Sequence, residues 1–121
     1  MKTKGKFSNL DLRVLDDDEM FEVLNNCVYM QVNFKYEINA GFVTDLASIP
    51  RGMRWWLKKT GKSRKPAVFH DHMIKTKWKS RRVADRMFKQ MLIDVGMSKW
   101  KANLYYFGVS LGTWWLGDYS E

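Results

Sequence analysis

SRRVADRMFKQMLIDVG, residues 80–96, is the clearest helix in the sequence. Apolar residues at helical spacing mark one face of it: Val83, Ala84, Met87, Phe88, Met91, Leu92 and Val95. Ser80 is a favourable N-cap, and Gly96 stands where a residue of positive φ commonly ends a helix. We therefore expect a helix that begins after Ser80 and ends before Gly96.

Further helices are expected on both sides of this segment. Pro66 suits the first turn of a helix over residues 66–75, and a short helix is expected over residues 50–59. After residue 98, large apolar residues recur at helical spacing: Trp100, Leu104, Phe107, Leu111, Trp114 and Trp115. Residues 102–117 carry no charge but fall short of the ~20 residues that a membrane span needs. We expect them to form a buried core helix, with no transmembrane span.

The first third of the sequence has the alternation of β-strands. Residues 10–14 alternate apolar with polar side chains. Residues 21–23 lead into Asn25-Asn26, where we expect a hairpin turn. Residues 28–38 alternate apolar with polar side chains and predict one long, half-buried strand. Strands before helices indicate an α+β protein: an N-terminal antiparallel β-hairpin or small sheet over about residues 7–45, then about four packed helices. The length of 121 residues suits a single domain, residues 1–121.

The charge of the chain favours anionic partners. Lys and Arg number 21 against 13 Asp and Glu, a net charge of +8. Two basic stretches, residues 58–65 and 75–82, supply candidate anion-binding residues: Lys58, Lys59, Arg64, Lys65, Lys77, Trp78, Arg81 and Arg82. Cations around an aromatic ring suit nucleic acid, anionic lipid or another cell-envelope polymer. The alternative is a solvated, lysine-rich loop without a ligand.

The single cysteine and the polar N-terminus exclude or disfavour several kinds of site and protein. Cys27 is the lone cysteine, so an intramolecular disulfide and a cysteine-rich zinc site are both excluded. The N-terminal lysines are followed by no apolar run, so we expect no signal peptide.

The two histidines, His70 and His72, flank Asp71. Residues two apart on a helix point away from each other, so the histidines do not face one site. We expect His70 to face inward, and its ring needs a partner from another element because the Asp71 side chain diverges by roughly 100°. Asp85, at the edge of the apolar face of residues 80–96, is a candidate partner. One alternative is a surface ion pair of Asp85 with Arg81 or Lys89. The other is that His70 is a core residue whose hydrogen bonds are satisfied and which has no catalytic role.

The stretch GFVTDLASIPR, residues 41–51, places one acid among apolar residues. Ser48 is explained as a helix cap, and no G-x-S-x-G frame marks it as a nucleophile. Capping does not explain Asp45, because a buried acid needs a cation, a histidine or a metal. We expect Asp45 to point at the same polar centre as His70 and Asp85.

The same segments resemble a known family. GFVTDLASIPR, FHDHMI and SRRVADRMF are followed by a spaced pattern made of Gly96, Trp100, Ala102, Tyr106, Val109 and Gly112. Together they resemble a domain of unknown function that is found in tailed phages and prophages, over about residues 28–112. The resemblance implies a location in the virion or the host cytoplasm and other phage proteins as partners. It implies no activity.

A more distant motif is similar to the compact phospholipases A2, in which a His-Asp pair on one helix precedes an Asp-x-x-Phe helix. That similarity implies His70 as the general base, Asp71 as a Ca²⁺ ligand and Asp85 as the acid that orients His70, with Asp45 as a further ligand or a direct partner of His70. The expected function is a Ca²⁺-dependent hydrolase of a lipid or cell-envelope substrate. The alternative is a non-enzymatic virion or early phage protein that binds a host target or nucleic acid, in which the His-Asp network is structural.

Overall fold

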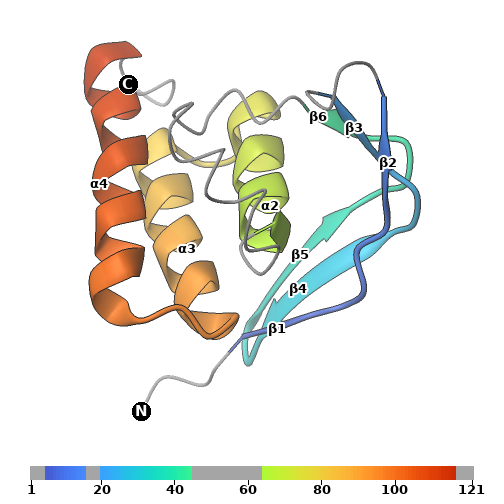
Figure 1. Cartoon of the computed structure of the whole chain (residues 1–121), viewed down its shortest axis with the longest axis horizontal. Helices are drawn as coiled ribbons and strands as arrows, with labels where there is room; N and C mark the ends of the chain where they lie inside the picture. Colours follow the sequence, from blue (N-terminus) through green and yellow to red (C-terminus); the bar gives the residue numbers. More distant parts are fainter. Residues whose placement is uncertain (1–4, 16–19, 45–63, 117–121) are drawn as a thin grey trace. The chain divides into compact units, whose positions relative to one another are not determined.

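The computed structural model describes residues 5–15, 20–44 and 64–116, with only the backbone described for residues 14, 64 and 112–116. The chain divides into two compact units, Met1–Asp45 and Leu46–Glu121, and each is described by itself. Strands make up the first unit and helices the second, so the predicted α+β class is confirmed (Figure 1). The helix expected over residues 50–59 lies outside the described residues, and a single domain over 1–121 stays a prediction.

The N-terminal unit contains two three-stranded antiparallel sheets. The first has the order β1-β4-β5, formed by Lys6–Phe7, Cys27–Gln31 and Phe34–Ile38. The second has the order β2-β3-β6, formed by Leu12–Val14, Phe21–Val23 and Val43–Thr44. Val23, Tyr29 and Ile38 are among the fully buried side chains of this unit.

The prediction of one long strand over residues 28–38 is wrong, because the segment forms a hairpin of two strands, β4 and β5. β4 and β5 pair with Gln31 opposite Phe34, so residues 32 and 33 form the turn. Paired residues face the same side of a sheet, and here each pair joins an odd-numbered to an even-numbered residue. The inward positions therefore switch from odd on β4 to even on β5. Tyr29 is buried as a result, whereas Met30 is 51% and Val32 69% exposed.

The hairpin predicted at Asn25-Asn26 is also wrong, because β3 and β4 belong to different sheets. The two asparagines instead hold distant segments together. The Asp11 N–H donates to Asn25 Oδ1 at 2.9 Å, and Asn25 Nδ2 donates to the Asn9 carbonyl at 2.8 Å. Asn26 Oδ1 accepts from the Ala40 N–H at 2.8 Å. Asparagine side chains that bond to the backbone can stabilise a connection between two sheets in the same way as they stabilise a turn.

The helical unit, named here for Leu46–Glu121, shows three helices in its described part. They are α2 (Arg64–Lys75), α3 (Arg81–Asp94) and α4 (Lys99–Leu116). α2 begins two residues before Pro66, which is tolerated because amides of the first turn have no partner within the helix. Both predicted ends of α3 are confirmed: Ser80 Oγ accepts from the Val83 N–H at 3.1 Å, and Gly96 has a φ of 102°.

α3 is the central element of the helical unit, since it packs against both α2 and α4 (Figure 1). Its inward face carries the buried residues Ala84, Asp85, Phe88, Met91 and Leu92. All but Asp85 are apolar, and these apolar residues belong to the face predicted from the sequence. A helix with neighbours on two sides needs a broad apolar face, which the close spacing of these residues provides.

The buried face of α4 is not the one that the large apolar residues predict. Ala102, Tyr105 and Val109, three and four residues apart, are buried. Trp100 and Leu104, expected in the core, are exposed instead. The buried side includes the large Tyr105 ring, which meets Phe88 of α3 edge to face, while Trp100 and Leu104 lie on the exposed side. In the described ranges, no helix combines the length and apolar character that crossing a membrane requires.

The hairpin register predicts different outcomes for two neighbouring residues of β4. Tyr29→Ala should lower the free energy of unfolding by about 3 kcal/mol, because the change empties a buried aromatic site. Met30→Ala should change it by less than about 0.5 kcal/mol, because Met30 is exposed. Chemical denaturation of both variants measures the difference. Equal losses would contradict the register.

The orientation of α4 is tested by adding bulk on each side of the helix. Ala102→Leu should cost about 1–3 kcal/mol, because the larger side chain has no room in a packed interior. Asn103→Leu, one residue further along, should cost less than about 0.5 kcal/mol, because residue 103 is exposed. Thermal unfolding of the pair is the measurement. A destabilised Asn103→Leu with a tolerated Ala102→Leu would reverse the assignment.

Candidate functional site

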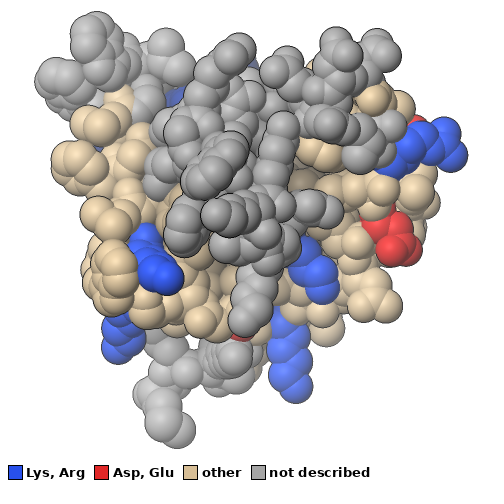
Figure 2. Space-filling model, in the orientation of Figure 1, with Lys and Arg blue, Asp and Glu red and all other residues tan. Residues whose placement is uncertain are grey.

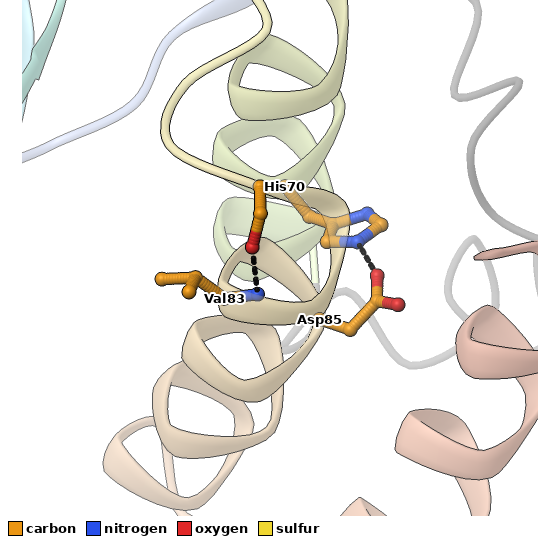
Figure 3. Close-up of polar contacts among 4 residues, drawn as sticks. His70, Val83 and Asp85 are labelled. Carbon is orange, nitrogen blue, oxygen red and sulfur yellow. Dashed lines mark hydrogen bonds and ion pairs between the residues drawn. The ribbon is translucent and has the colours of Figure 1, made fainter. Parts of the chain in front are cut away.

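A buried histidine–carboxylate pair joins α2 to α3. His70 Nε2 lies 2.7 Å from Asp85 Oδ1, and the two residues are 0% and 2% exposed (Figure 3). The contact expected from the sequence is therefore present. Asp85 does not lie at the surface, where the alternative ion pair with Arg81 or Lys89 places it.

The positions of both residues follow from the helices that carry them. Asp85 and Phe88 are three residues apart on α3, so they share the face that meets α2. The His70 ring packs on Phe88, with ring centroids 4.8 Å apart and planes inclined by 38°. Ser80 sets where α3 begins, and packing against α2 and α4 sets which of its residues face inward. Phe88 thus supports the His70 ring while Asp85 binds one of its nitrogens.

The hydrogen bond assigns different roles to the two nitrogens of His70. An ionised carboxylate accepts hydrogen bonds and donates none, so Nε2 carries the proton in the bond to Asp85. In the neutral ring, Nδ1 then holds the lone pair. A buried carboxylate in this position keeps the imidazole in one tautomer and one orientation. Such a pair suits an oriented general base, and it equally suits a structural polar contact in the core.

Asp71 is buried beside this pair but has another partner. Its Oδ2 lies 3.2 Å from Lys75 Nζ, one turn further along α2. Within the described residues no group of three or more His, Cys, Asp or Glu side chains could hold a metal ion. The Lys75 ammonium is thus one partner of Asp71, and Ca²⁺ binding by Asp71 stays a prediction. The i, i+4 spacing to Lys75 is visible in the sequence and could have identified this partner.

His72 lies on a different side of α2 from His70, as the two-residue spacing predicts. It is half-buried, whereas His70 is fully buried. Burial lowers the pKa of His72 below its ordinary value of 6.5, and the negative charge of Asp71 offsets part of that lowering. His72 is therefore neutral at pH 7 in the folded chain.

Several predicted site residues fall outside the described part of the chain. They are Asp45, Lys58 and Lys59, together with the side chain of Arg64. Whether Asp45 points at His70 thus stays a prediction.

The other predicted anion-binding residues do not form one cluster. Lys65 is in the first turn of α2, whereas Lys77 follows its last turn, roughly 15 Å away along the helix axis. The structure groups the second set at the connection between α2 and α3: Lys77, Trp78, Arg81 and Arg82. The Lys79 ammonium lies 5.2 Å from the centre of the Trp78 ring. On the face shown in Figure 2, Lys and Arg side chains appear at separate places rather than in one patch.

Tyr105 of α4 contacts Phe88, the residue on which the His70 ring packs, and the sequence did not indicate it as a site residue. Its ring meets Phe88 edge to face, with centroids 6.5 Å apart. The hydroxyl is buried and has no hydrogen-bond partner among the described residues. Burial raises the pKa of Tyr105 to about 12, so the hydroxyl keeps its proton at neutral pH. No sequence signal marked it, because its neighbours Leu104 and Phe107 predicted a different buried face.

The comparisons with known proteins identify the family of the chain. The family described as "Protein of unknown function (DUF1353)" matches residues 21–109, which include both members of the His70–Asp85 pair. No curated protein and no solved structure gave a significant match. The matched range is close to the one over which the motifs resemble a domain of unknown function. Since the match covers most of the chain, the protein belongs to the DUF1353 family.

Proposed function

We propose that the protein is a small hydrolase in which His70 is the general base and Asp85 holds its ring. The observation that carries the proposal is the buried 2.7 Å bond between Nε2 and the Asp85 carboxylate. A structural histidine needs only some hydrogen-bond partner, whereas an ionised partner also stabilises the protonated ring that forms during base catalysis.

The proposed reaction is the hydrolysis of an ester. Nδ1 of His70 removes a proton from a water molecule, and the water oxygen bonds to the acyl carbon. The ester C–O bond then breaks, and the imidazolium returns the proton to the departing alkoxide. Asp85 acts through His70: it fixes the tautomer and stabilises the positive ring, without touching the substrate.

The charge of the chain supports an anionic substrate for this reaction. The net charge of +8 raises the local concentration of anionic molecules and surfaces. A lipid or cell-envelope ester has this property and agrees with the motif-level likeness to the phospholipases A2. The resemblance to a phage domain adds the setting that we propose, a virion or an infected host cell with other phage proteins as partners.

Calcium belongs to the proposal only through that likeness. Asp71 lies 3.2 Å from the Lys75 ammonium, and Asp45, the other residue proposed near the metal, lies outside the described residues. No step of the proposed reaction passes through a metal ion.

A second candidate function is a non-enzymatic phage protein that binds a host target or nucleic acid. The observation that favours it is the complete burial of His70, packed on Phe88. A base that acts on substrate must be reached by it, whereas a polar network that specifies one packing needs no access. In this case the basic residues near Trp78 bind phosphate groups.

The proposed function predicts that hydrolysis depends on His70. His70→Asn should lower the rate of ester hydrolysis on anionic phospholipid vesicles or on an ester-bearing cell-envelope polymer by about 10²–10⁴-fold, because a positioned general base contributes that much. Asp94→Asn is the matched control: Asp94 is another buried acid of α3, nine residues or about 13 Å beyond Asp85. Its rate should equal that of the wild type. Each assay is run with Ca²⁺ and with a chelator.

Folding is measured on the same proteins by circular dichroism. A folded wild type that hydrolyses neither substrate would contradict the hydrolase and favour the second candidate.

The His70–Asp85 bond predicts a loss of stability when one partner is removed. Asp85→Ala should lower the free energy of unfolding by about 3 kcal/mol, because it leaves a buried imidazole without its ionised acceptor. Asp85→Asn keeps an oxygen that accepts from Nε2–H, so it should cost about 1 kcal/mol. Denaturant titration at pH 7 compares the two variants. Equal small losses would contradict a buried, bonded pair.

A further inference from the structure

α4 carries a continuous apolar stripe on its exposed side. Trp100, Leu104, Phe107 and Leu111 follow one another at intervals of four, three and four residues, and are 64%, 59%, 65% and 45% exposed. We call these four residues the outer stripe. At 1.5 Å per residue it extends for about 16 Å along the helix. Monomeric proteins rarely expose bulky residues in a contiguous row, so the outer stripe indicates a binding surface.

Cations border the outer stripe. Lys99 and Lys101 flank Trp100 in the first turn of α4, each about 100° around the helix from it. The Lys101 ammonium lies 5.6 Å from the centre of the Trp100 ring. Further along, Lys89 of α3 lies 5.6 Å from the centre of the Tyr106 ring. The surface therefore combines an apolar row with positive edges.

The charges of the helical unit are sorted by sign. Between residues 64 and 116 the sequence contains three acids, Asp71, Asp85 and Asp94, and all three are buried. Arg82 and Arg86 of α3 are exposed, as is Lys99 of α4. The described surface of this unit thus presents positive side chains and no exposed carboxylate. Such a surface complements an anionic partner and repels a like-charged one.

We infer that α4 docks on an anionic lipid surface, with the outer stripe inserted among the acyl chains and Lys99 and Lys101 at the phosphates. A helix with an apolar row of Trp, Leu and Phe between lysines lies in the plane of a membrane interface. Trp side chains are enriched at the level of the lipid headgroups, and each nearby lysine strengthens the attraction to anionic lipid. A second copy of the chain is the poorer occupant, because pairing two such helices brings cations together, with no exposed carboxylate between residues 64 and 116 to offset them. Lipid binding of this kind does not require that His70 be catalytic.

Vesicle flotation of the full chain tests this inference. The wild type should float with phosphatidylglycerol vesicles, should bind phosphatidylcholine vesicles at least about tenfold more weakly, and should be released by salt. The double variant Leu104→Ser/Phe107→Ser should bind phosphatidylglycerol at least about tenfold more weakly, because two inserted side chains are lost. Lys99→Glu/Lys101→Glu should lose a similar factor at low salt.

Val32→Ser is the matched control, because Val32 is as exposed as the outer stripe but belongs to the β4–β5 turn. It should bind phosphatidylglycerol like the wild type, and thermal unfolding should be the same for all variants. No vesicle binding by the wild type overturns the inference, as does undiminished binding by Leu104→Ser/Phe107→Ser. A dimer detected by light scattering that this double variant abolishes, without vesicle binding, would assign the outer stripe to a second copy instead. Flotation measures no hydrolysis, so its result is separate from that of the hydrolase assay.

Discussion

The bond between His70 and Asp85 constrains how α2 and α3 pack in the described part of the helical unit. An ionised carboxylate that leaves water loses several kcal/mol of solvation, which only a close and well-aligned partner restores. At 2.7 Å the imidazole of α2 is such a partner, and it binds the carboxylate across the interface of two helices. A shift of α3 along α2 by one residue would separate the pair and break this buried bond. The bond therefore fixes the register of the two helices.

The same requirement governs the other acids of this unit. Asp71 has the Lys75 ammonium at 3.2 Å, and Asp94 accepts a hydrogen bond from Gln90 at 2.9 Å. Each buried carboxylate thus has a partner on its own helix or the next one. Between residues 64 and 116 the acids are therefore inside, and this described part of the unit presents mainly cations to solvent. That sorting leaves the α4 surface positive around its apolar row, which is a strong argument for an anionic surface as its partner.

Two expectations from the sequence were wrong for the same physical reason. Apolar periodicity shows which residues lie on one side of an element, but not which side meets a neighbour. On α4 both sides are apolar, and packing against α3 buries the side that carries Tyr105, while the side that carries Trp100 and Leu104 is exposed. On β4 both sides also carry apolar residues, and the two-residue turn selected Tyr29 over Met30. In each case the buried side depends on a second element: α3 for α4, and the antiparallel strand β5 for β4.

The sequence by itself determined the features that depend on local chemistry. Ser80 and Gly96 set the ends of α3, the order of alternating and helical segments set the α+β class, and the divergence of His70 from Asp71 required separate partners for them. The tertiary structure decided which residues those partners are and which faces are buried. Asp71 binds Lys75, and His70 reaches Asp85 through the packing of α2 on α3. The reason is that a periodic pattern specifies directions around a single helix or strand, whereas burial and hydrogen bonding depend on the distance to a second one.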